Sequence, residues 1–248
     1  MPSSYRALCT DFYVNQKLNV KLDLPRSRET VLDLFERVRR EYPEMRSFRR
    51  YKDEVALESP QDEGVHRWIA IRSNSIRSGV VNPQTDDDAY GLHRCVLEVA
   101  PYFLSISPLD LEYVELLYGF DLASGGNHDA IVAQALMGSS PMSSLVDVPG
   151  AIAVDCQPLI GLTLGKGTDV EAHFEVKTRS AASVREVERR DEPISIYLTL
   201  RQFEPVTDLR ELPDRFDRLA RRGQELVDER VLPALLTPIR EAIATNNL

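Results

Sequence analysis

The sequence is poor in the residues from which metal sites are usually built. It contains only four histidines, and none of them belongs to an HxH or HExxH motif. These residues are His66, His93, His128 and His173. Because zinc and related metals are bound by closely spaced histidine and cysteine ligands, we expect neither a metal nor another cofactor.

Cysteine is equally scarce. Cys9, Cys95 and Cys156 are odd in number, widely spaced and without a CxxC pair, which favours buried free thiols over a disulfide framework. The sequence has no GxSxG elbow, and the glycines of Gly161–Gly167 lack the spacing of a P-loop. No catalytic motif is therefore present from which an enzymatic activity could be assigned.

Long apolar runs and an excess of positive charge are also absent. No run approaches the roughly 20 apolar residues that span a bilayer, and residues 1–6 have no apolar signal-peptide core. We expect a cytoplasmic protein with no membrane partner. The formal net charge is −9, whereas duplex-binding domains normally carry a basic surplus. This charge disfavours nucleic acid as a partner.

One basic segment stands against this acidic background. Residues 37–52 hold seven Arg or Lys residues, opposed only by Glu41 and Glu44. We interpret the segment as a solvated helix end followed by a strand edge. The alternative is a site for an anion or an acidic partner, with Arg49 and Arg50 as its central residues.

Alternation and helical periodicity together predict a mixed α+β chain. In the first half we expect strand 5–22, helix 30–42, strands 49–59 and 65–72 with a short extension at 76–81, and a helix that begins at Thr85 or Asp86. Apolar residues at i, i+3, i+4 and i+7 indicate the first helix, and Pro43 ends it.

The second half is expected to repeat this order of strands and helices. We expect strand 109–122, a short helix 128–137 capped by Asn127, strands 151–164, 169–180 and 194–203, and a long helical region 209–245 interrupted at Gly223, Pro233 and Pro238. A hairpin turn is expected at Gly165–Gly167 and a charged loop at 181–191. Alternation in the later strands places Phe174 and Leu198 inward and Glu175 and Thr199 outward.

These elements predict an α+β fold in a single domain, 1–248, built of two similar βαββα-like halves, about 1–107 and 108–248. The halves should pair edge to edge into one curved, largely antiparallel sheet. Helices, including the long kinked C-terminal helix, should cover one face. The other face must then be polar, be covered by something else, or bind something.

The opening strand and helix (Val14–Tyr42) and the closing helix (Phe216–Ile243) resemble those of a sporadically distributed family of uncharacterised bacterial proteins of about this length. The resemblance follows much of the chain in order and carries no diagnostic motif. It implies the architecture alone, because it brings no catalytic residues that could be mapped onto this sequence.

Two groups of residues are candidate sites. Gly125, Gly126 and Asn127 form a glycine turn that leads into a helix N-terminus, where free N–H groups can bind an anion; an ordinary capped helix is the alternative. Glu171, His173 and Glu175 share the polar side of a strand and could line a cavity, or could simply form a solvated sheet face.

Three functions are compatible with these patterns. The first is an accessory or interaction protein that binds another macromolecule, most naturally a protein, through its sheet face or charged surface. The second is a small-molecule binding protein or atypical enzyme with a cavity between the sheet and the C-terminal helix. The third is nucleic-acid binding through residues 37–52.

Overall fold

A computed structural model describes residues 5–61, 64–165, 170–178 and 192–246. Its strands are β1 (Asp11–Val20), β2 (Ser47–Arg50), β3 (Val55–Glu58), β4 (His66–Ile71), β5 (Ser75–Val81), β6 (Leu111–Leu122), β7 (Leu159–Thr163), β8 (Val170–Lys177) and β9 (Ile194–Gln202). Its helices are α2 (Arg28–Glu41), α3 (Asp86–Phe103), α4 (His128–Met137), α5 (Ser143–Val146), the 3₁₀ turn η2 (Leu209–Glu211), α6 (Leu212–Leu226), the π-helical η3 (Val227–Leu236) and α7 (Thr237–Asn246).

The strands form one open antiparallel sheet in the order β2-β3-β4-β5-β1-β6-β9-β8-β7. Each half of the chain begins at the centre of this sheet, with β1 or β6, and these two strands pair with each other. Each half then crosses to its own outer edge and returns strand by strand to its starting strand. The predicted α+β class, the antiparallel sheet and the joining of the two halves are confirmed.

One face of the sheet carries the core. Along β1, residues of even number such as Phe12, Val14 and Leu18 are buried, and the register places Phe120 and Leu198 on the same face. Glu175 and Thr199 lie on the other face, as the alternation predicts. Burial of this apolar face supplies the main driving force for the fold.

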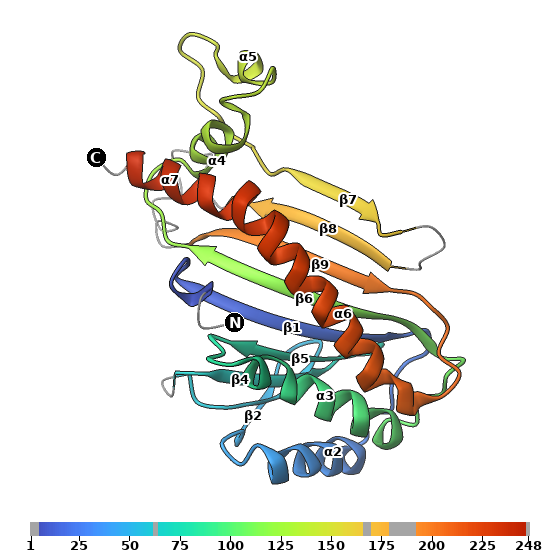
Figure 1. Cartoon of the computed structure of the whole chain (residues 1–248). Helices are drawn as coiled ribbons and strands as arrows, with labels where there is room; N and C mark the ends of the chain where they lie inside the picture. The colour runs from blue at the N-terminus through green and yellow to red at the C-terminus, as the bar shows by residue number, and fades with distance from the viewer. Residues whose placement is uncertain (1–4, 62–63, 166–169, 179–191, 247–248) are drawn as a thin grey trace.

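Helices cover this apolar face, as Figure 1 shows for α2, α3 and the C-terminal helix. Their N-termini are capped as the sequence indicates: Ser27 accepts from the N–H of Thr30, Thr85 from that of Asp88, and Asn127 from that of Ala130. Each cap satisfies a backbone donor that has no partner within its helix.

The C-terminal helix runs without a break from α6 through η3 into α7. The predicted irregularity lies at Pro233, inside the π-helical turns of η3, because proline removes an N–H donor from the helical ladder. Gly223 does not interrupt the helix. It lies within α6 and faces the ring of Tyr118.

Three predicted strands are shorter or more divided than expected. The region 5–22 forms a strand only over β1, and 151–164 only over β7. The region 49–59 contains the end of β2 and all of β3, joined by a turn in which the N–H of Tyr51 donates to the carbonyl of Glu54. The predicted turn after Gly165 and the predicted loop 181–191 fall outside the described residues.

Among the described residues, no helix combines the length and the apolar character that crossing a membrane requires.

Candidate functional site: the open face of the sheet

The face of the sheet opposite the helices is polar and aromatic rather than apolar. Its central strands contribute side chains such as Asn15, Lys17, Glu115 and Tyr197, with Trp68 on β4. Most of them are half-buried because they lie against their neighbours on the sheet. This surface, which we call the open face, has both hydrogen-bonding groups and rings available to a partner.

Two aromatic rings lie flat on the open face because glycine stands beside each of them. A Cβ atom on Gly79 would lie 2.2 Å from the Trp68 ring, and one on Gly119 would lie 2.1 Å from the Tyr13 ring. Each glycine lies directly opposite its aromatic residue on the neighbouring strand. Any larger residue would lift the ring away from the sheet.

A hollow of about 280 Å³ opens beside Trp68. Asn15 and Lys17 of β1, Arg77 of β5 and Glu115 of β6 are among its lining residues. The Arg77 guanidinium lies 5.6 Å from the centre of the Trp68 ring, a cation–π distance. Four strands that are scattered along the sequence therefore meet at one place.

Among the lining residues whose side chains lie on the open face, two buried polar atoms have no hydrogen-bond partner within the described part of the chain. They are Oδ1 of Asn15 and Nε of Arg77. Because buried polar atoms are nearly always paired in native proteins, these two are candidates for groups that a bound molecule would satisfy.

Ion pairs fix the charged side chains around the hollow. Glu54 binds both Arg72, at 2.7 Å, and Arg77. Burial opposes ionisation of Glu54, but the hydrogen bond from Arg72 and the charge of Arg77 outweigh it and hold its pKa below the ordinary value. Arg77 is thereby held over Trp68 by a partner that stays charged at neutral pH.

The central strands carry a second set of fixed polar contacts. Lys17 Nζ donates to the Tyr113 hydroxyl at 2.8 Å, and Arg201 Nε donates to Glu115 at 2.6 Å. Tyr13 donates to Asp121, and burial followed by hydrogen bonding with Tyr197 raises the pKa of Tyr13 above its ordinary value. Tyr13 therefore stays protonated near neutral pH, and the paired groups give the open face a defined pattern of donors and acceptors.

The predicted cavity residues do lie on the open face, but away from this hollow. Glu171, His173 and Glu175 belong to β8, three strands away from β1. The His173 ring lies over Gly161, and Glu175 pairs with Lys177 at 3.3 Å. They extend the polar surface towards β7 and are not among the residues that line the hollow.

The glycine turn Gly125–Asn127 leads into α4, as predicted. Asn127 caps the helix, and its side-chain amide also donates to the carbonyl of Ala153 at 2.8 Å. Asp129, in the first turn, is buried and accepts from the N–H of Cys156 and the hydroxyl of Thr178. The helix dipole therefore already has a carboxylate beside it, which leaves less attraction for a bound anion.

Arg49 and Arg50 lie on β2, an outer strand of the sheet. Five strand positions separate β2 from β6, which leads to the glycine turn, so the structure does not bring the two predicted anion sites together. Within residues 37–52, Arg37 pairs with Glu41 and Arg39 with Glu36. Much of this basic charge is thus compensated locally.

The layer between the sheet and the C-terminal helix is filled by side chains. Tyr118, Phe216 and Val227 are fully buried there. A hollow of about 430 Å³ lies instead between α3 and α6, on the outer side of the helices, and Arg94 and Asp217 form a 2.7 Å ion pair at it. None of the described residues that line this second hollow has an unpaired buried polar atom, whereas Asn15 and Arg77 do, so the small-molecule hypothesis has better support on the open face.

The cysteines are free and the described residues group no metal ligands. Burial raises the pKa of both Cys9 and Cys95 to about 12, and Cys156 is also buried. Such thiols are poor nucleophiles at neutral pH. Over residues 5–61, 64–165, 170–178 and 192–246, no three His, Cys, Asp or Glu side chains cluster as a metal site would require.

Sequence reasoning missed the residues of the hollow. Alternation along a strand can be read from the sequence. It places Trp68 on one side of its strand and every second residue of Tyr113–Asp121 on one side of theirs. What the sequence did not show is that β1 lies between β5 and β6, which brings Asn15 and Lys17 beside Trp68 and Glu115.

Searches with models of known protein families and among curated proteins find no match to this chain.

Proposed function

We propose that this chain is an accessory protein that binds another protein through the open face of its sheet. The observation that carries this proposal is the group of aromatic residues and arginines on the open face. Trp, Tyr and Arg are the residues most enriched at the energetic centres of protein interfaces. Here Trp68, Tyr13 and Tyr197 lie on the open face. Arg77 lies over the ring of Trp68, and Arg201 lies over the ring of Tyr113 on the same face.

The charge of the open face favours a protein over a nucleic acid. Lys17, Arg77 and Arg201 are each bound to a polar or acidic neighbour on the same face. Phosphate backbones require an excess of free cationic groups, and the chain as a whole has a formal charge of −9. A mixed pattern of fixed charges instead suits a partner with a complementary pattern.

Site-specific photo-crosslinking in native extract tests the proposal. The photoreactive residue p-benzoylphenylalanine would replace Tyr197 on the open face or Tyr102, an exposed aromatic residue of α3 on the helical side. We expect a discrete crosslinked product from the Tyr197 position that protease removes and nuclease does not. The Tyr102 position is the matched control and should not give this product.

Charge reversal completes the test. Lys17→Glu should abolish the crosslink from the Tyr197 position, whereas Arg40→Glu, on the exposed side of α2, should leave it unchanged. The same product from both photoreactive positions, or a product insensitive to Lys17→Glu, would contradict recognition by the open face. A nuclease-sensitive product would favour nucleic acid instead.

A small molecule in the Trp68 hollow is the second candidate. The unpaired Oδ1 of Asn15 and Nε of Arg77 favour it, and the volume of about 280 Å³ is close to the lower limit of ligand pockets. A panel of polar metabolites would be screened by thermal shift. A ligand that stabilises the wild type and loses its effect in Asn15→Ala would support this candidate.

A further inference from the structure

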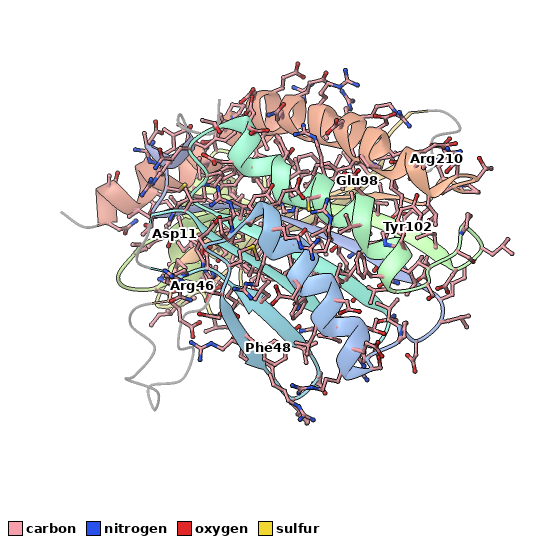
Figure 2. All side chains as sticks on the ribbon, turned by 90° about the horizontal axis from the view of Figure 1, so that it is seen from below. Asp11, Arg46, Phe48, Glu98, Tyr102 and Arg210 are labelled. Carbon is pink, nitrogen blue, oxygen red and sulfur yellow. The ribbon has the colours of Figure 1, made fainter. Side chains whose placement is uncertain are left out.

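The two outer strands of the sheet differ in how they are protected from pairing with another chain. At one edge, β2 is four residues long and carries Arg49 and Arg50, and Phe48 on its helix side contacts Phe35 of α2 with ring centres 5.9 Å apart. Figure 2 labels Phe48 at this edge, beside α2. Short length, charge and a covering helix are the usual means of blocking an edge strand.

The opposite edge, β7, is also short, with five residues, but among the described residues it has neither charged side chains nor a covering helix. Its sequence, LIGLT, contains no charged residue. Ile160 and Leu162 lie on the helix side, next to Phe174 and Ala172 of β8, yet they are 57% and 50% exposed. Figure 1 shows the C-terminal helix crossing the central strands without reaching β7.

The segment that leads into β7 is also apolar and exposed. It contains α5, which projects from the body of the molecule in Figure 1. Between residues 142 and 162, nine large apolar side chains are exposed: Met142, Leu145, Val146, Val148, Ile152, Val154, Leu159, Ile160 and Leu162. We call residues 142–162 the apolar arm and edge.

The area of this surface matches one side of a stable protein interface. Nine residues of this size, each about half exposed, present on the order of 900 Å² of surface, much of it apolar, and one partner in a standard interface contributes about 800 Å². Monomeric proteins rarely leave a larger apolar patch uncovered than a few hundred Å². The apolar arm and edge therefore has the size of a subunit contact.

We infer that this surface joins two copies of the chain in a symmetric dimer. The two β7 strands pair antiparallel about a two-fold axis near Gly161, which places Ile160 of one copy opposite Leu162 of the other. The pairing continues the antiparallel order of the sheet, and it satisfies the outer backbone groups of both strands.

The low charge of this strip allows two copies to meet there. Two chains of formal charge −9 repel each other over most of their surfaces. Residues 142–162 hold only Asp147 and Asp155 as charged groups, so this is a region where two copies meet with little repulsion. Each copy contributes the same apolar strip, and a two-fold interface requires such self-complementarity.

The arms take part in the same contact. In the monomer, Leu145 and Ile152 are 70% and 76% exposed. Pairing at β7 brings the arm of each copy next to the uncovered helix side of the partner's β7. The dimer is closed, because the arginine-bearing β2 edges remain at its two outer ends and do not propagate the sheet.

Sedimentation velocity of the full chain at concentrations from about 1 to 100 μM tests the dimer. We expect a species of twice the chain mass of 28.1 kDa. Leu162→Lys should weaken dimerisation by about a hundredfold, because an unpaired lysine would be buried at the contact. The matched control is Leu109→Lys, at a residue that is 87% exposed and shortly precedes β6, three strand positions from β7. It should leave dimerisation unchanged.

Hydrogen exchange of the wild type provides a measurement that does not depend on a variant that folds. The β7 amides that point away from β8 should become protected as the protein concentration rises. A monomer at every concentration, a dimer that tolerates Leu162→Lys, unprotected β7 amides in the dimer, or a mass that grows without limit would each overturn the inference.

Discussion

Gly223 of α6 packs directly against the ring of Tyr118 on the central strand β6. A Cβ atom at this position would lie 2.4 Å from Cε2 of the ring. The Tyr118 hydroxyl donates to the carbonyl of Ala220 at 3.0 Å and lies 2.9 Å from the Tyr90 hydroxyl. The close approach of helix and sheet therefore depends on the missing side chain, and the buried hydroxyl is satisfied only at this distance.

Gly223→Ala should destabilise the protein by about 1–2 kcal/mol, because steric overlap with Tyr118 exceeds the gain of about 1 kcal/mol in helix propensity. Urea denaturation would measure the loss. The control is Gly91→Ala in α3, where the nearest atom to a new Cβ is the movable Tyr42 hydroxyl at 3.0 Å. Equal effects at the two positions would contradict the packing argument.

Trp68 is the single tryptophan of the chain, so its fluorescence reports on the hollow alone. Gly79→Ala should lift the ring from the sheet and increase its quenching by acrylamide, because a Cβ there would overlap the indole. Gly125→Ala, at a position with nothing within 4 Å of the new Cβ, should leave quenching unchanged. Unaltered quenching in Gly79→Ala would show that the ring does not rest on Gly79.

The pH dependence of stability should carry a contribution from His93. This residue is fully buried against the sheet, with Nδ1 2.7 Å from the Ser78 hydroxyl, and burial lowers its pKa to about 3. In the unfolded chain the pKa is about 6.5, so the unfolded state binds more protons between these two values. Stability should therefore fall as the pH falls below 6.5.

Between pH 7 and pH 5 the loss from His93 should be roughly 2 kcal/mol, measured by urea denaturation at each pH. His93→Gln should lower stability at pH 7 but flatten the dependence over this range. If the stability of His93→Gln depended as steeply on pH as that of the wild type, the pH dependence would come from other groups.

Asp129 ties the apolar arm to the body of the protein. Its carboxylate accepts from the N–H of Cys156 and from the Thr178 hydroxyl, both buried. Asp129→Ala should leave these donors unsatisfied and cost about 2 kcal/mol. Hydrogen exchange should accelerate at residues 151–158 more than at β1. Asp155→Ala, at an exposed carboxylate in the same segment, is the control and should change neither quantity.

Local patterns in the sequence were sufficient to predict most of the strands and helices. The alternation of Ile194–Gln202 and the 3.6-residue period of α2 follow from side-chain geometry within a few residues, so they are readable without the fold. The region 151–164 was predicted as one strand. It forms a strand only over β7, since Asp129 and Asn127 hold Cys156 and Ala153 by hydrogen bonds outside the sheet.

The sequence by itself determined the class of the fold, the face that each later strand buries and the caps of the helices, because these depend on neighbours in the chain. Only the tertiary structure decided the strand order. That order places β1 between β5 and β6, assembles the Trp68 hollow from four strands, and puts β7 at the edge of the sheet. Such contacts join residues far apart in sequence, and no local periodicity records them.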